Sequence, residues 1–107
     1  MTPEDFRRIA LELPGAVESA HMNHPDFRVN NKIFATLGYP DKACAMIKLP
    51  PGKQREFVEL GHAAFSPVKG AWGKQGATTV ELAKAREDTV RAALTLAWQS
   101  TSQKKRR

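Results

Sequence analysis

The spacing of apolar residues changes along the chain, and each change predicts a different element. At the start, Thr2-Pro3-Glu4-Asp5 has the composition of a helix N-terminus, with a hydroxyl cap, an early proline and two acids. The apolar residues that follow at helical spacing are Phe6, Ile9, Ala10 and Leu13. Pro14-Gly15 then ends the pattern, so the spacing predicts a short amphipathic helix.

From Val17 to Leu49 the period falls toward two, which is typical of strands. The runs are VESAHM, DFRVN, KIFATL and ACAMIKL, separated by His24-Pro25, Asn30-Asn31 and Tyr39-Pro40-Asp41. Short connections of this kind join neighbouring antiparallel strands. The pattern therefore predicts an antiparallel meander. Both faces of its last strand are mostly apolar, so we expect that strand to be covered on both sides.

The turn at Asn30-Asn31 allows two registers. A three-residue turn through Lys32 places Val29 opposite Ile33 and makes one face almost wholly apolar. That face would hold Phe27, Val29, Ile33, Ala35 and Leu37, and the other face Arg28, Phe34 and Thr36. A two-residue turn would pair Val29 with Lys32 and mix the faces, so we predict the longer turn.

The second half of the chain predicts two further helices with strands between them. Pro50-Pro51-Gly52 opens a helix that Gly61 ends, and Phe57 and Leu60 are its expected anchors. The segments Phe65 to Val68 and Thr78 to Leu82 are expected to form short strands.

The last helix is predicted from about Ala85 to Gln99. Its expected apolar stripe is Val90, Ala93, Leu94, Ala97 and Trp98, which places Trp98 in the core.

Composition is that of one ordinary domain. The chain has 107 residues, of which 41% are apolar and 26% charged, and we expect a single domain over residues 1–103 with a basic tail at 104–107. No apolar run is long enough for a membrane span, and MTPEDFRRIA lacks the pattern of a secretory signal. We therefore expect a cytoplasmic protein without a membrane partner, with the monomer favoured. The single cysteine, Cys44, is expected to be a small buried residue.

The net charge of +6 depends largely on the KKRR tail, because the preceding residues hold 13 basic and 11 acidic groups. The distribution is uneven, however. Residues 1–26 hold two basic and five acidic groups, whereas residues 27–55 hold six basic groups and one acid. Such asymmetry can attract a polyanion, although charged segments are usually just solvated surface.

Residues with catalytic or metal-binding potential do not form a recognisable motif. His21 and His24, with Asp26 nearby and His62 later, are the only cluster resembling a metal site. In one extended segment, positions three apart point to opposite faces, so this spacing argues against a shared metal. No nucleophile motif surrounds the single thiol or the serines. We therefore expect no metal, no cofactor and no enzyme activity.

The stretch SPVKGAWGKQGATTVEL places Trp72 among three glycines and two lysines. Gly73-Lys74-Gln75-Gly76 has the form of the loop with which KH domains hold a nucleic-acid backbone, but that loop joins helices, and the flanks here predict strands. The same residues can form a hairpin tip in which glycines permit positive φ. Whether Trp72 packs into a core or stacks on bases stays open.

Three segments resemble the MmcQ/YjbR family of small bacterial proteins. They are HPDFRVNNKIFATLG, AFSPVKGAWGKQGATTVEL and the closing helix with ALTLAW, and they occur in the same order over nearly the whole chain. The resemblance implies an α+β fold with a helix at each end of an antiparallel sheet, similar to frataxin. It also implies a "double wing" mode of DNA binding, but no catalytic or iron-binding residues.

The leading hypothesis is therefore a DNA-binding protein without enzyme activity that uses two basic hairpins. Its expected contact residues are Arg28, Lys32, Lys69, Trp72 and Lys74. The alternative is a small protein-interaction or ligand-binding module whose sheet face, with Phe34 and Met46, docks a partner.

Overall fold

The computed structural model of the chain describes residues 1–39, 41–61 and 63–103. The helices are α1 (Pro3–Glu12), α2 (Pro51–Leu60), α3 (Ala71–Lys74) and α4 (Glu87–Ser102), with a 3-10 helix, η1, at Leu82–Lys84. The strands are β1 (Val17–His21), β2 (His24–Val29), β3 (Lys32–Leu37), β4 (Cys44–Lys48), β5 (Phe65–Pro67) and β6 (Ala77–Glu81). None of the described helices is long and apolar enough to cross a membrane.

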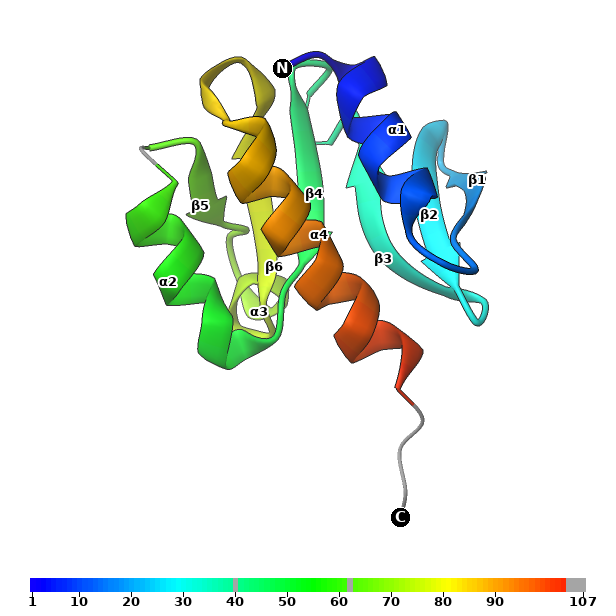
Figure 1. Cartoon of the computed structure of the whole chain (residues 1–107). Helices are drawn as coiled ribbons and strands as arrows, with labels where there is room; N and C mark the ends of the chain where they lie inside the picture. Colours follow the sequence, from blue (N-terminus) through cyan, green and yellow to red (C-terminus); the bar gives the residue numbers. More distant parts are fainter. Residues whose placement is uncertain (40, 62, 104–107) are drawn as a thin grey trace.

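The six strands form one antiparallel sheet in the order β1-β2-β3-β4-β6-β5. The first four strands are the predicted meander, and β6 then pairs with β4, which leaves β5 at the edge. Helices α1, α4 and α2 lie over one face of the sheet (Figure 1). The fold is therefore two-layered, and the predicted α+β class is confirmed.

Helix α1 begins as the sequence predicts. The backbone N–H of Asp5 donates to the Thr2 hydroxyl at 3.1 Å, and the Asp5 carboxylate accepts from the Thr2 N–H at 2.9 Å. This reciprocal capping box satisfies two backbone donors that a helix start would otherwise leave unpaired. Those hydrogen bonds hold the pKa of Asp5 below its usual range, with the Thr2 backbone as the largest cause.

The predicted register of the β2–β3 hairpin is wrong. Asn30 and Asn31 form a two-residue turn with φ values of +53° and +65°, and Val29 pairs with Lys32. A pair of asparagines suits this turn because both central positions need positive φ. This turn alone would mix apolar and polar residues on each face, but a bulge shifts the register farther along the strands. Arg28 pairs with Ile33, whereas Phe27 pairs with Ala35, so Phe34 has no partner in β2.

Because of the bulge, Ile33 and Phe34 lie on the opposite faces of the sheet from those predicted. Phe34, the extra residue, is fully buried in the core, whereas Ile33 faces the opposite side of the sheet. A bulge lets two successive side chains share a face, which strict alternation does not foresee. The module hypothesis placed Phe34 on a docking surface, and that placement is also wrong.

The core lies between the sheet and the three long helices. Its largest fully buried apolar side chains are Phe6, Phe27, Phe34, Ile9, Ile47, Leu94, Val80 and Val90. The predicted apolar stripe of α4 is confirmed except at Trp98. Trp98 is only partly buried: it packs against the core, and its indole N–H donates to the Pro14 carbonyl at 2.8 Å. In α2, Phe57 is buried as expected, but Leu60 is 61% exposed and anchors nothing. Strand β4 is covered on both sides, and Cys44 is buried, as predicted.

Candidate functional site

The glycine-rich connection between β5 and β6 is not a simple hairpin tip. Residues 71–74 form the single-turn helix α3, and two glycines fix it against the rest of the fold. A methyl group at Gly73 would lie 1.7 Å from the Val68 carbonyl oxygen. One at Gly76, where φ is +110°, would lie 1.8 Å from the Leu49 carbonyl oxygen. The glycines therefore permit close backbone packing, and a phosphate-clamping loop is not needed to explain them.

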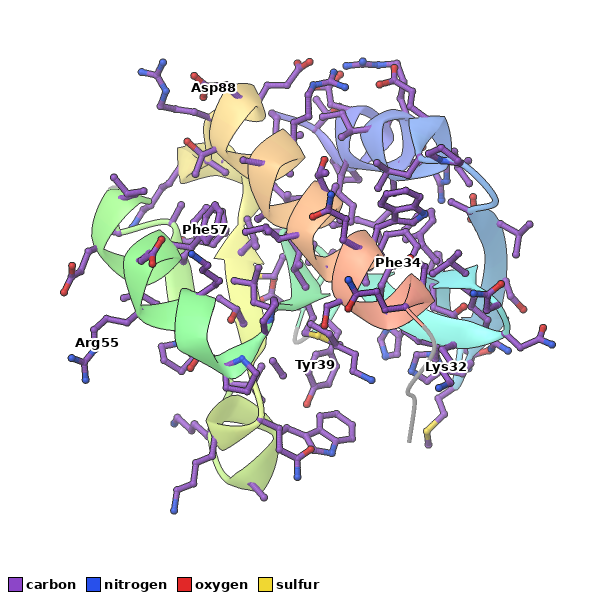
Figure 2. All side chains as sticks on the ribbon, turned by 60° about the horizontal axis from the view of Figure 1, so that its bottom comes forward. Lys32, Phe34, Tyr39, Arg55, Phe57 and Asp88 are labelled. Atoms are coloured by element: carbon purple, nitrogen blue, oxygen red, sulfur yellow. The ribbon has the colours of Figure 1, made fainter. Side chains whose placement is uncertain are left out.

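Helix α3 carries Trp72 to the surface. The indole is 57% exposed, so Trp72 is not a core residue. It forms part of a groove on the face of the sheet opposite the three long helices. In Figure 2, α3 and Tyr39, another lining residue, lie on the side of the sheet away from α4.

The groove has a volume of about 540 Å³, within the range of small-molecule sites. Its lining comes from β1, β2, β3, β4, β6 and α3 and the adjoining turns. The lining residues are His21, Met22, His24, Ile33, Thr36, Tyr39, Met46, Lys48, Trp72, Gln75 and Ala77. Four of these form two cross-strand pairs, since Thr36 pairs with Met46 and Lys48 pairs with Ala77. None of the lining residues is acidic, so the groove presents one lysine and two imidazoles without a compensating lining carboxylate.

A buried carboxylate lies beside this groove. Asp26 is fully buried, and its two oxygens accept from the Arg28 guanidinium at 2.8 and 3.1 Å. One oxygen also lies 2.7 Å from Nδ1 of His21. These contacts, with Arg28 the largest cause, hold the pKa of Asp26 below its usual range although burial opposes the shift. The same contacts orient the His21 ring at the groove.

The two histidines lie together, contrary to the expectation from their spacing. Met22 and Asn23 form a tight turn with φ values of +50° and +67°, so His21 and His24 are direct cross-strand partners. Their ring centroids are 6.5 Å apart, and the His24 ring also lies edge-to-face with Tyr39 at 6.0 Å. The third histidine, His62, lies outside the described residues. Among those that are described, no three His, Cys, Asp or Glu side chains are grouped to hold a metal ion.

The floor of the groove includes one polar group without a partner. Thr36 is 2% exposed, and its hydroxyl makes no hydrogen bond to any described group. Its two cross-strand neighbours are Asp26, whose oxygens are already engaged, and Met46. A buried hydroxyl without a partner is uncommon and costs stability.

The predicted DNA-contact residues fall into two groups. Arg28 is held by Asp26, so its charge is largely neutralised. Lys32, Lys69 and Lys74 are exposed, and Lys32 begins β3 at the hairpin (Figure 2). Lys69 and Lys74 flank Trp72 along the chain.

Lys48, Tyr39, Thr36 and Gln75 were not singled out from the sequence. The alternation of β4 places Lys48 on the same face as Met46, but only the sheet order brings that face next to α3.

Comparisons with known proteins agree with this fold. The chain matches the family model described as YjbR over residues 11–100. No curated protein sequence matches it. Among solved structures, it is similar to the crystal structure of the Deinococcus radiodurans protein DR2400, which has the family domain DUF419, with a TM-score of 0.78. The two are 18% identical over 96% of this chain and 80% of that chain, a likeness that shows the fold. Because the family model covers most of its length, the chain belongs to the YjbR family.

Proposed function

We propose that this protein binds DNA through lysines that surround the Trp72 groove. The main support is that three exposed lysines in this region, Lys48, Lys69 and Lys74, make no ion pair with any described residue. Most other cations of the described chain are paired with acids, as in Arg7 with Glu4 and Glu18. Unpaired cations can neutralise phosphates and release the counterions condensed on the DNA without first breaking an ion pair.

These three lysines lie at the groove or beside it. Lys48 lines the groove itself, and Lys74 and Lys69 lie in or next to the α3 segment that carries Trp72. Lys32 is also unpaired among the described residues, but it is the cross-strand partner of the core residue Val29, so it shares the face of Val29 and is not counted with the groove lysines. An exposed indole bordered by cations suits nucleic acid because the cations contact phosphates and the ring can stack on a base. Arg28 is left out of this proposal because Asp26 holds its guanidinium.

The test is the salt dependence of DNA affinity, measured by fluorescence anisotropy with a labelled 20-mer. A chain ending at Gln103 serves as the background, so that the four consecutive basic residues at 104–107 do not contribute to the measured affinity. Replacing Lys69 and Lys74 with alanine should weaken binding for all sequences. It should also lower the slope of log K against log salt by about 1 to 2, since each phosphate contact contributes roughly 0.9.

The matched control replaces Lys84 and Arg86 with alanine. This pair removes the same charge near the far end of β6, where both groups are already paired with Glu81 and Asp88. The control should leave the slope unchanged. Loss of all salt-sensitive binding on removal of the tail, or equal slopes for the two double variants, would reject the proposal.

A further inference from the structure

We infer that the groove on the face of the sheet opposite α1, α4 and α2 binds a small planar aromatic anion with the chemistry of a nucleoside monophosphate. This inference goes beyond the proposed DNA binding, because it concerns the groove lining and does not need Lys69 or Lys74. It rests on three features of the lining: its flat side chains, its charge and its unpartnered hydroxyl.

The lining combines flat side chains with an apolar floor. Trp72 and Tyr39 come from segments 33 residues apart in sequence, and the fold places both on the groove. Met46 and Ile33 add apolar surface to the same lining. Aromatic side chains at a groove favour a planar ligand because stacked rings gain both buried area and favourable electrostatics. The volume of about 540 Å³ is larger than one ring needs, and leaves room for a sugar-sized linker and a charged group.

The charge of the lining selects an anion. Lys48 is exposed at the groove without an ion-pair partner among the described residues, and the imidazoles of His21 and His24 lie side by side on the same lining. The one nearby carboxylate, Asp26, is fully buried and committed to Arg28 and His21. A cationic ligand would meet no free acid here, whereas a phosphate would find an ammonium group at hand.

Two polar groups suit the edge of a heteroaromatic ring. The side chain of Gln75 offers both a donor and an acceptor. Thr36 has the buried hydroxyl without a partner, and rotation about its χ1 exchanges the methyl and the hydroxyl toward the groove. A ligand that accepts or donates a hydrogen bond there would remove the cost of leaving that group unpaired. A purely hydrocarbon ligand would leave the Thr36 hydroxyl without a hydrogen-bond partner.

The experiment titrates the full chain carrying Trp98→Phe with adenosine or uridine 5′-monophosphate. In this background Trp72 is the remaining tryptophan, and its fluorescence reports occupancy while calorimetry gives the stoichiometry. We expect saturable one-to-one binding that changes Trp72 emission. Adenosine without phosphate and ribose 5-phosphate without a base should each bind much more weakly, because each lacks half of the recognised chemistry.

Two variants and a control locate the site. Lys48→Gln should weaken binding by roughly tenfold, the effect of one charge-assisted hydrogen bond. Thr36→Val should weaken it by about fivefold without lowering stability, because a hydroxyl of no use to the fold is removed. Arg55→Gln, which removes an exposed charge on α2 (Figure 2), should change nothing.

The inference is overturned if neither monophosphate saturates, if ribose 5-phosphate binds as tightly as they do, or if Lys48→Gln and Arg55→Gln have the same effect. Binding of a single-stranded oligothymidylate with no binding of either monophosphate would also overturn it. That last outcome leaves the proposed DNA binding standing. Conversely, monophosphate binding with no salt-sensitive DNA binding would support the groove site and reject the proposed function.

Discussion

Substitution of Gly73 by alanine tests the placement of the segment that carries Trp72. The added methyl would lie 1.7 Å from the Val68 carbonyl oxygen, about half the ordinary contact distance of 3.4 to 4 Å, and 2.8 Å from the carbonyl carbon. Both atoms belong to the backbone, so no flexible side chain can move aside. Helix α3 must therefore shift away from Val68, or the connection must deform.

The expected cost follows from overpacking. Forcing an extra methyl group into a filled space typically costs about 1 to 3 kcal/mol, and backbone contact places Gly73 at the upper end. The gain in helix propensity of alanine over glycine, at most about 1 kcal/mol, offsets only part of this cost in a single-turn helix. We expect a net loss of about 2 kcal/mol, which corresponds to a fall in melting temperature of roughly 8 to 16 °C for a domain of this size.

The assay is thermal and urea unfolding followed by circular dichroism, with two matched glycines for comparison. Gly52→Ala, in the first turn of α2, meets nothing within 4 Å and should be neutral or slightly stabilising. Gly70→Ala also meets open space but has φ of +84° and ψ of −157°, a region essentially restricted to glycine, so it should show the backbone cost alone, about 1 to 3 kcal/mol. If Gly73→Ala and Gly52→Ala have the same melting temperature and urea midpoint, the close approach to Val68 is absent and the position of α3 is wrong.

Further predictions concern the groove and the core. Thr36→Val should leave the free energy of unfolding unchanged or raise it by up to about 1 kcal/mol in urea titrations, and a clear loss would show that the hydroxyl has a partner. Asp26→Asn should cost about 2 kcal/mol at neutral pH, because it weakens the bonds to Arg28 and His21. Since the pKa of Asp26 is lowered in the fold, the stabilisation by its carboxylate is complete above the unfolded-state pKa near 4 and is lost as pH falls through the folded-state pKa. The difference in unfolding free energy between wild type and Asp26→Asn should therefore close below about pH 4. A difference that stays constant with pH would contradict this. Trp98→Ala should destabilise the fold by about 3 kcal/mol and Trp98→Phe by less, because the indole packs against the core and its N–H donates to the Pro14 carbonyl. Equal unfolding midpoints for wild type and Trp98→Ala would reject that role. Metal analysis of the purified protein should show no stoichiometric zinc or iron.

Most elements of the fold could be predicted because they depend on local chemistry, whereas helix α3 was expected to be a hairpin tip. Thr2 and Asp5 cap α1 through contacts three residues apart, and the spacing of Val90, Ala93 and Leu94 defines the buried face of α4. Such patterns act within one or two turns of helix, so the order of residues is sufficient to reveal them. The family resemblance seen in the segments was likewise confirmed.

Register and the sides of the sheet required tertiary structure. Either turn length at Asn30-Asn31 was compatible with the local sequence, and the bulge that buries Phe34 satisfies packing against helices distant in the chain. The spacing of His21 and His24 misled for a related reason. Their separation by three residues implies opposite faces in one strand, but a turn between them makes them partners across two strands.

The lining of the groove could be predicted only in part from the sequence. The sequence by itself identified Trp72 and the lysines around it as unusual, because glycines, an aromatic ring and charges adjacent in sequence can be recognised directly. It could not join Trp72 to Tyr39, Thr36 and Lys48, since these residues meet only after β6 pairs with β4 and α3 is fixed by backbone contacts at Gly73. Those contacts are long-range, and their formation depends on the packing of the whole sheet. Local periodicity therefore determined most of the elements, and tertiary packing decided which side chains share a surface.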